Sequence, residues 1–581
     1  MIASKPRLSF AQIINMNVGF FGIQYSFGLQ QSAVNPIYDF LGAKPDEIPW
    51  LNLAGPLTGL IIQPIIGALS DKTWHPKFGR RRPYFFIGAI MCSLALFFFP
   101  FSSSLWMAAG LLWILDAGNN TAMEPYRAFV ADKLDSSQQG TGFQAQSFFT
   151  GFGQTLANLS LFIFPMIIVG KTGAIPNWVF GSFFLGAVCS VTSIWWSMRT
   201  TPEIPPSDEE IKAIKEYNAD KPPVLVQFLG YIIALSAVPL LIRLGLNSFI
   251  NTDILNILTL PVFFCWIFFL EFLLNRYKHI SAVNSIRLLI SPLIEIIDAI
   301  KTMPRVMWLL ALVYLFQWYA LFCYWQNSSK AIAKNSFEWK LLNDDESKVK
   351  AKFTLFEDAL KKFAIENKLE LADIKKTDST YTMLYNNWSG KLNMQQHLSG
   401  SDLQTLEAVH INDKKYEQAV SWTGLVNFWY NVVTFLVAFG LVVLAKKIGP
   451  RQVHTFCLLM AGAGFIAFAF VQNKYLFFPA ITGFGIGWAS MMGIPYLIVM
   501  SDIPKERYGV YMGIINMMIV IPMFIQTITF GYVMKHFLHN DSSKAVGFAG
   551  ILLLIAAVAT LLIKNKKINS NELAMPAGGG H

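Results

Sequence analysis

Long apolar segments recur along this chain, and they limit what it can fold into more than any other feature. A helix that crosses a membrane needs roughly 20 mostly apolar residues, and fourteen segments of about this length occur here. They lie at 10–31, 49–69, 84–101, 105–130, 143–168, 177–198, 224–246, 254–275, 305–326, 420–445, 453–471, 475–500, 508–534 and 545–563. The chain is therefore expected to be an all-α membrane protein.

The scarcity of charge supports the same class. Only 14% of the 581 residues are charged, against about 25% in an ordinary soluble domain. A soluble chain of this length would need more charge to coat its surfaces, so a soluble enzyme, a disordered protein and a disulfide-rich secreted module are all excluded. The five cysteines all fall within apolar segments, which gives no sign of a disulfide framework.

The excess of basic residues, +10 overall, indicates topology rather than a nucleic-acid partner. No Lys/Arg tract outside the apolar segments is interleaved with stacking aromatic residues. If both termini are cytoplasmic, cytoplasmic loops and ends hold 26 of the 46 Lys and Arg residues and the short loops of the other side hold six. This contrast matches the positive-inside rule. The first apolar segment runs on as a full span, so we interpret it as a transmembrane helix, not a signal peptide.

Five regions follow from the order of the segments. They are an N-terminal six-helix bundle (1–200), a cytoplasmic linker with two additional spans (201–275), a cytoplasmic amphipathic segment with the first span of a C-terminal bundle (276–326), an external helical insert (327–419), and the rest of that bundle with a cytoplasmic tail (420–581). The insert carries 14 basic and 14 acidic residues. It is either a passive decoration or a lid over the substrate path, and its partner is unknown.

A loop motif joins the second and third apolar segments. It consists of two glycines, one acid and three arginines, namely Gly67, Asp71, Gly79, Arg80, Arg81 and Arg82. The glycines permit close helix approach and a tight turn, and Asp71 can accept hydrogen bonds or pair with an arginine. This arrangement resembles the cytoplasmic loop signature of the major facilitator superfamily, with extra residues between Asp71 and Gly79. A degraded copy at 440–451 is what two related halves would leave.

Four stretches, at 53–67, 113–132, 304–308 and 509–522, indicate a more specific group within this superfamily. They are similar to those of the glycoside–pentoside–hexuronide:cation symporter group, which includes plant sucrose–proton symporters and bacterial maltose and α-glucoside transporters. The resemblance implies a major facilitator fold of two six-helix bundles. Here that fold would carry two inserted spans, about 14 transmembrane helices in all, and the external insert. The additional spans and the insert have no counterpart in the resemblance.

One acid lies in the middle of an apolar segment. Asp116 occupies a position where an ionised carboxylate costs roughly 2.5–3.5 kcal/mol, and helical spacing puts Asn119, Asn120, Glu124 and Arg127 near its face. Glu124 and Arg127 are three residues apart and can pair. Asp116 and Arg127 are separated by roughly 16 Å along a straight helix and cannot touch. Asp116 is expected to change its charge during function, with a role in packing alone as the alternative.

The coupling ion is expected to be the proton. The family resemblance puts the proton-coupling acid at Asp116 and an essential arginine at Arg127, and we assign Glu124 to the same coupling or gating group. Sodium-coupled members of the wider group carry additional acids on the second span, whereas 49–69 has none. No other cofactor and no metal site are expected.

Candidates for sugar contact combine amides with an aromatic ring, because a disaccharide presents both hydroxyls and apolar ring faces. They are Gln24, Asn119, Asn120, Gln317, Trp318, Asn427 and Asn431. A single aromatic residue of this kind can equally be an interface anchor or face lipid. The clustering therefore supports sugar contact by the group as a whole, not by each residue in it.

The sequence thus predicts a proton-coupled symporter that imports an α-glucoside disaccharide of the maltose or sucrose type by alternating access. Its partners would be a small sugar and membrane lipid, and its location the bacterial inner membrane. The loop of Asp71 and Arg80 to Arg82 would hold the outward-open state. The alternatives are the same machinery for another glycoside or cell-wall sugar, or a transporter-like receptor or scaffold. A membrane enzyme is not expected, because the spans contain no apparent nucleophile–base pair or metal-ligand cluster.

Overall fold

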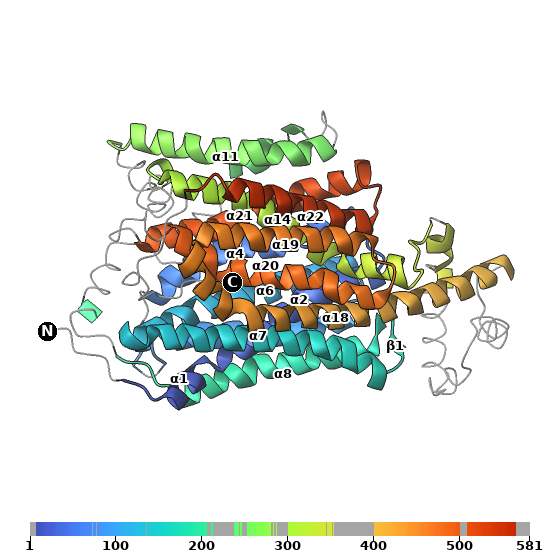
Figure 1. The fold of residues 1–581 in the computed structure, drawn as a ribbon, viewed down its shortest axis with the longest axis horizontal. Helices are drawn as coiled ribbons and strands as arrows, with labels where there is room; N and C mark the ends of the chain where they lie inside the picture. Colours follow the sequence, from blue (N-terminus) through green and yellow to red (C-terminus); the bar gives the residue numbers. More distant parts are fainter. Residues whose placement is uncertain are drawn as a thin grey trace.

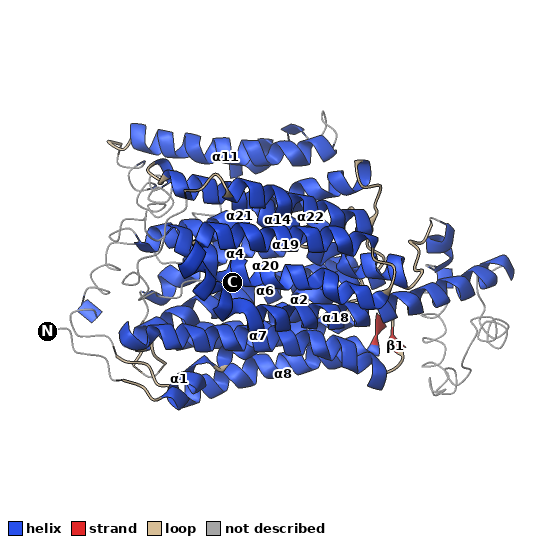
Figure 2. Ribbon diagram, in the orientation of Figure 1, coloured by secondary structure: helices blue, strands red, loops and turns tan. Residues whose placement is uncertain are grey.

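The described part of the protein is built almost entirely of helices, as Figure 2 shows. The computed structural model describes residues 7–71, 74–76, 78–134, 136–205, 211–212, 237–242, 245–246, 252–280, 283, 286, 300–343, 345–350, 352–353, 400–499 and 508–564. The axes of the long helices are roughly parallel or antiparallel to one another (Figure 1). The only strands among the described residues form a short antiparallel pair, β1 (Lys171–Thr172) with β2 (Ile175–Pro176).

The first half of the bundle runs from α1 to α8. Its helices are α1 (Phe10–Asn17), α2 (Gly19–Phe40), α3 (Ile48–Leu51), α4 (Ala54–Asp71), α5 (Arg82–Phe98), the 3₁₀ turn η1 (Phe99–Phe101), α6 (Leu105–Lys133), α7 (Ser136–Ile167) and α8 (Asn177–Thr200). Ser104 caps α6 by accepting a hydrogen bond from the backbone of Met107. Between α1 and α2, the backbone N–H of Gly19 donates to the hydroxyls of Tyr126 and Ser197, which anchors α2 to α6 and α8.

The second half runs from α14 to α22. Its helices are α14 (Arg305–Ser336), α18 (Gly400–Ile448), α19 (Pro450–Phe470), the 3₁₀ turn η2 (Lys474–Leu476), α20 (Phe477–Val499), α21 (Tyr508–His536) and α22 (Ser542–Thr560). Between the halves in sequence lies α11 (Thr252–Arg276), which packs against α21 at the edge of the bundle (Figure 1, top). It corresponds to the second of the two predicted additional spans. The first, 224–246, falls largely outside the described residues.

The two halves repeat one packing scheme. In the first half α5 packs on α6 and α8, α2 packs on α7 and α8, and α4 packs on α6. The second half has the matching pairs, with α19 on α20 and α22, α14 on α21 and α22, and α18 on α20. The halves meet where α7 packs against α18, where α4 packs against α21, and where α2 approaches α14 and α18. Two bundles related in this way are the predicted architecture.

Seven of the described helical segments are long and apolar enough on composition alone to cross a membrane. They are Arg82–Phe101, Asn177–Thr200, Arg305–Ser336, Pro450–Phe470, Lys474–Val499, Met517–His536 and Ser542–Thr560. Helices α2 and α6 are not among them, because their inner faces carry amides and an acid. The chain is an integral, multi-pass membrane protein whose most polar helices lie inside the bundle.

Both ends of the predicted insert, 327–419, are helical where the structure describes them. Helix α14 continues to Ser336, and α18 begins at Gly400, so both ends of that region are continuous with spans. Figure 1 shows α18 projecting beyond the other helices. Residues 400–419 are charged yet helical, with Leu406, Val409 and Tyr416 buried. Residues 345–350 and 352–353 are helical, and 354–399 lie outside the described residues.

Candidate functional site

A central cavity lies between the two halves. Its first wall comes from α2, α4, α6 and α7, with Phe27, Gln30, Gln31, Asn35, Gly55, Gly59, Gln63, Asp116, Asn120, Met123 and Gln154, together with Asn52 ahead of α4. Its second wall comes from α14, α20 and α21, with Trp318, Phe322, Trp325, Gln326, Trp488, Ile519, Val520 and Met523. One wall is therefore rich in amides and holds the acid, and the other is mostly aromatic and aliphatic.

Asp116 sits in the polar wall, and its side chain is almost completely buried, with 1% of the residue exposed. The Nε2 group of Gln30 on α2 donates a hydrogen bond of 2.7 Å to its Oδ1 atom. Its Oδ2 atom has no hydrogen-bond partner in the described part of the chain. The nearest approach of α4 is at Gly55, where a side chain would come within 3.8 Å of Oδ2. The acid thus has one oxygen held by a hydrogen bond and one buried oxygen without a partner among the described residues.

The two asparagines after Asp116 have different surroundings. Asn120 lines the cavity and is held by α4, because it donates to Thr58 Oγ1 (2.9 Å) and accepts from Gln63 Nε2 (2.7 Å). Asn119 is turned away from the cavity, donating to Ser26 Oγ at 3.1 Å and accepting from a cysteine thiol of α5. Asn120 is thus placed for ligand contact, whereas Asn119 ties three helices together.

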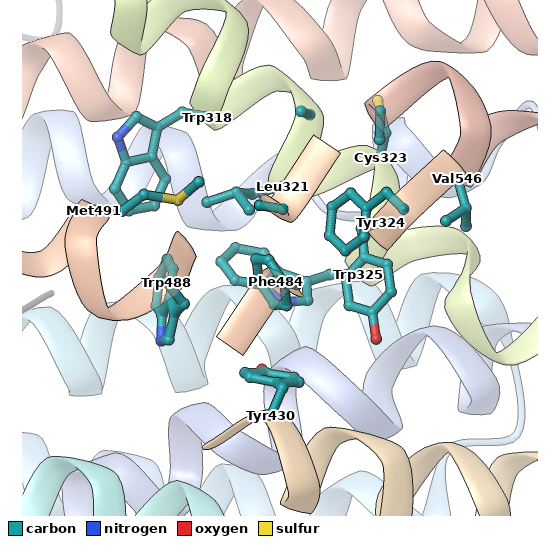
Figure 3. Close-up of a cluster of buried hydrophobic side chains, with 14 of the residues drawn as sticks. Trp318, Leu321, Cys323, Tyr324, Trp325, Tyr430, Phe484, Trp488, Met491 and Val546 are labelled. Carbon is teal, nitrogen blue, oxygen red and sulfur yellow. The ribbon is translucent and has the colours of Figure 1, made fainter. Parts of the chain in front are cut away.

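The aromatic wall consists of three tryptophans from two helices. The rings of Trp318 and Trp325 on α14 lie 5.9 and 5.6 Å from the ring of Trp488 on α20, both nearly perpendicular to it. Figure 3 shows Trp318 and Trp488 beside Phe484, which packs against Trp488 in turn. Edge-to-face packing fixes the rings relative to one another. The cluster gives the cavity a rigid apolar surface opposite the amides.

The other predicted sugar contacts lie behind the cavity wall. Gln24 accepts a hydrogen bond from Gln154, which itself lines the cavity. Asn427 donates to Ser32 Oγ of α2 and accepts from the Tyr324 hydroxyl, so it links the two halves. Two further candidates stand apart in the second half. Asn431 donates to a backbone carbonyl of its own helix, and Gln317 is fully buried without a hydrogen bond among the described residues. Of the predicted set, only Asn120 and Trp318 line the cavity.

The cavity also contains residues that were not among the predicted site residues, chiefly Gln30, Gln63, Gln154 and Trp488. Gln63 could have been found from the sequence, since it is the single amide among the mostly apolar residues 54–69 of the second span. Trp488 has none, because one tryptophan in an apolar segment looks the same whether it faces lipid or a cavity.

The ion pair expected from the spacing of Glu124 and Arg127 is present, with Arg127 Nη1 3.0 Å from Glu124 Oε1. Both side chains are mostly buried, with 12% and 25% exposed. Arg127 also contacts Met123 but does not contact Asp116. Any link between Asp116 and Arg127 must therefore run along α6 or through the solute.

One end of the bundle, which we call the motif end, holds the loop of Gly79 to Arg82. The carboxylate of Glu203, which follows α8, accepts hydrogen bonds from the backbone N–H groups of all three arginines, at 2.8 Å from Arg81 and 2.7 Å from Arg82. Gly79 has a φ of +84°, and a side chain there would collide with that carboxylate. The backbone N–H groups of this turn thus bind a carboxylate, and the positive φ at its first position requires glycine.

The arginine side chains of the motif end then join four helices. Arg81 pairs with Asp132 of α6 at 3.0 Å and donates to Ser70 Oγ of α4 at 2.7 Å. Arg82 donates to the Met198 carbonyl near the end of α8. Gly67 and Asp71 lie in α4, and the side chain of Asp71 is outside the described residues.

The second half repeats this arrangement in reduced form. Gly449 precedes α19 with a φ of +97°. Arg451 donates to the backbone carbonyls of Leu561 and Ile563 beyond α22, as Arg82 does to the end of α8. The degraded copy predicted from the sequence is thus a structural counterpart.

The opposite end, the insert end, is closed by a buried ion pair between the halves. Lys330 of α14 lies 2.5 Å from Asp39 of α2, with only 3% and 6% of the two side chains exposed. Tyr416, on the projecting part of α18, donates a hydrogen bond to the same carboxylate. Asn35 adds a contact from α2 to the Trp325 carbonyl. Three separate segments therefore hold this end shut in the observed state.

No group of three or more His, Cys, Asp or Glu side chains able to hold a metal ion occurs within the described residues. The arrangement provides a central cavity between two similar helical bundles, with distinct contacts at the two ends of the molecule. Such a fold is that of a membrane transporter.

The chain belongs to the Major Facilitator Superfamily, whose family model matches residues 16–333. Solved structures with the same fold include the nucleoside transporter NupG, with a TM-score of 0.52, 10% identity and coverage of 95% of this chain and 98% of that one. An auto-inhibited POT family peptide transporter gives a TM-score of 0.55 at 12% identity, covering 95% of this chain and 96% of that one. Identities this low establish the fold alone.

Among curated proteins, the chain is similar to plant sucrose transport proteins. It is 32% identical over 142 residues to SUC3 of Arabidopsis thaliana, a match covering 21% of this chain and 24% of that protein. It is 27% identical over 229 residues to SUT5 of Oryza sativa subsp. indica, covering 33% of this chain and 41% of that protein. The matches thus span less than half the length of these relatives.

Proposed function

We propose that this protein is a proton-coupled symporter that imports an α-glucoside disaccharide of the maltose or sucrose type. The observation that carries the proposal is the buried acid Asp116, hydrogen-bonded on one oxygen and without a partner on the other among the described residues, in the wall of a cavity shared by both halves. The partial similarity to plant sucrose transport proteins supports a sugar as the solute.

The two walls of the cavity suit a sugar. Amides such as Gln31 and Asn120 offer donors and acceptors to hydroxyl groups, and the rings of Trp318 and Trp488 offer apolar faces to the pyranose ring. A nucleoside or a peptide would call for a different pattern, since neither presents a ring bordered by hydroxyls on all sides.

A proton fits this site better than a sodium ion. Sodium requires several oxygen ligands converging on one point, whereas Asp116 receives a single donor and faces a glycine across its free oxygen. Burial makes the ionised form of Asp116 costly. Binding a proton removes this cost before the protein changes conformation with the solute bound.

For alternating access we assign the motif end to the cytoplasm and the insert end to the outside, with both termini cytoplasmic and the bacterial inner membrane as the location. The distribution of Lys and Arg supports this orientation. In the observed state the pair of Asp39 and Lys330 then closes the external entrance. The external segment contributes Tyr416 to that closure, which favours a lid over a passive decoration.

The test is uptake of labelled maltose and sucrose by proteoliposomes with an imposed pH gradient. Wild-type protein should accumulate at least one of them when the outside is acidic. Asp116→Asn should abolish accumulation but keep exchange of labelled for unlabelled sugar, because the amide resembles a permanently neutral acid. Glu271→Gln is the matched control, since Glu271 is a buried acid on α11 that pairs with Lys301 and does not line the cavity.

Each alternative has its own outcome. Accumulation driven by sodium at constant pH would reject the proton. Transport of another glycoside or a cell-wall sugar, with neither maltose nor sucrose moved, would keep the mechanism and change the solute. Full gradient-driven accumulation by Asp116→Asn would remove Asp116 from the coupling.

A further inference from the structure

We propose that Gln30 is the positioning residue through which sugar binding and the charge of Asp116 depend on each other. This inference rests on the proposed function and adds a residue to it. Gln30 and Asp116 come from different helices, α2 and α6, and both line the cavity. Gln30 Nε2 donates to Asp116 Oδ1 at 2.7 Å. No other hydrogen bond to the Asp116 side chain is found within the described residues.

The other end of the same amide is unsatisfied. Gln30 Oε1 is buried and has no hydrogen-bond partner in the described part of the chain. Buried polar atoms without partners are rare in native proteins and mark places where a ligand or water completes the set. One side chain therefore holds the acid with its donor and leaves an acceptor without a partner in the same cavity.

The orientation of the amide depends on the charge of the acid. An ionised carboxylate can only accept hydrogen bonds, so it holds the NH₂ group of Gln30 toward α6. A protonated acid can also donate. Its O–H can then bond to Gln30 Oε1, which turns the amide over and points the NH₂ group at the solute. Proton binding thus changes what Gln30 offers the sugar from an acceptor to a donor.

A sugar oxygen that accepts from Gln30 therefore binds the protonated protein more tightly. By reciprocity, the bound sugar raises the affinity of Asp116 for its proton by the same factor. The chain of hydrogen bonds from acid to amide to sugar reinforces itself, since each bond polarises the next. This linkage is what a symporter requires, because a proton or a sugar alone should not be carried.

Few other groups can produce the same pH dependence. Among the described residues, the titratable groups that interact electrostatically with Asp116 are Tyr38 on α2 and Cys92 on α5, and both ordinarily titrate above the range of the test. From α4 and α7 the cavity receives Gly55 and Gln154, which do not titrate.

The experiment is sugar exchange in proteoliposomes without a gradient, measured between about pH 5.5 and about pH 7.5, using maltose and sucrose as probes. The half-saturating sugar concentration of the wild type should rise about fivefold or more with pH, the lower bound of ordinary site-to-site coupling. In Gln30→Met it should change less than about twofold across the same range, with exchange retained. Gln30→Asn, whose shorter side chain withdraws the amide from Asp116, should show the same small change. If the methionine variant does not fold, the asparagine variant alone tests whether the pH dependence needs Gln30.

Gln31→Met is the matched control. Gln31 is the next residue, also lines the cavity and has no bond to Asp116. This variant should weaken sugar binding equally at all pH values and keep the wild-type slope. A wild-type slope in both Gln30 variants would overturn the inference while leaving the proposed function intact. Absence of sugar exchange by the wild-type protein would instead overturn the proposed function.

Discussion

The buried ion pair at the insert end offers a direct test of how this protein closes. Replacing Lys330 by methionine leaves the carboxylate of Asp39 buried without its cation whenever the insert end is shut. In a state where that end is open, water reaches Asp39 and little is lost. The substitution therefore raises the free energy of the closed state selectively and should move the population toward the open one.

The size of the shift follows from the geometry. Removing one partner of a buried pair costs roughly 3–5 kcal/mol, and this pair is 2.5 Å apart with 3% and 6% of the side chains exposed. The hydroxyl of Tyr416 still donates to Asp39 in the variant, so the lower figure of about 3 kcal/mol applies. At 1.4 kcal/mol per factor of ten, the open population should rise roughly a hundredfold.

The assay is the rate at which a membrane-impermeant maleimide, added on the insert side of proteoliposomes, reacts with a cysteine introduced at position 35 after the five native cysteines are replaced by serine. Asn35 lines the cavity below the ion pair and is 4% exposed, so its cysteine variant reacts only when the insert end opens. Lys330→Met should raise the rate roughly a hundredfold, and adding Asp39→Asn should return it toward the starting value. Lys334→Met is the control, because Lys334 lies one turn along the same helix but pairs with Asp541 inside the second half.

Equal labelling rates for the Lys330 and Lys334 variants would refute the reasoning. They would mean that the pair does not distinguish the closed state from the open one, and that helix packing between the halves sets the equilibrium.

Two further predictions concern stability, measured as thermal unfolding in detergent. Gly79→Ala should destabilise the protein by about 1–3 kcal/mol, because φ is +84° and the new Cβ would meet Glu203 at 2.5 Å; Gly110→Ala, which meets no atom within 4 Å, should not. At Asp541, burial raises the pKa, but the hydrogen bond and charge of Lys334 and two backbone N–H groups outweigh it, so the pKa lies below its ordinary value. The stability that Asp541 contributes is thus complete above the ordinary pKa of about 3.9 and is lost as the pH falls through the native pKa. Asp541→Asn keeps a capping oxygen but removes the charge paired with Lys334, so it should cost up to about 1 kcal/mol at neutral pH and less in acid, and an equal cost at both pH values would contradict this assignment.

Local features of the sequence predicted much of the site. Asp116 stands out because an acid in a span is costly, and the pairing of Glu124 with Arg127 follows from helical spacing. The contacts that cross between helices did not follow. Gln30 and Asp116 are 86 residues apart in the chain, and Asp39 and Lys330 are 291 apart. No local periodicity relates such positions, so neither bond could be read from the sequence.

The candidate sugar contacts were harder for the same reason. Amides on helices were recognisable, but which of them face the cavity depends on how each helix is rotated in the bundle. Asn119 and Asn120 are adjacent in sequence, yet one ties three helices together and the other lines the cavity. A rotation of about 100° between successive residues separates the two roles.

The sequence by itself determined that this protein lives in a membrane, that it is helical and that it consists of two related halves, because apolar length and repeated motifs are properties of the chain. The tertiary structure decided what those halves do to one another. It placed Gln30 against Asp116, joined Asp39 to Lys330 and set three tryptophans opposite the amides. These are contacts between distant segments, and only packing fixes them, since a hydrogen bond or an ion pair depends on distances of a few ångströms that no single helix specifies.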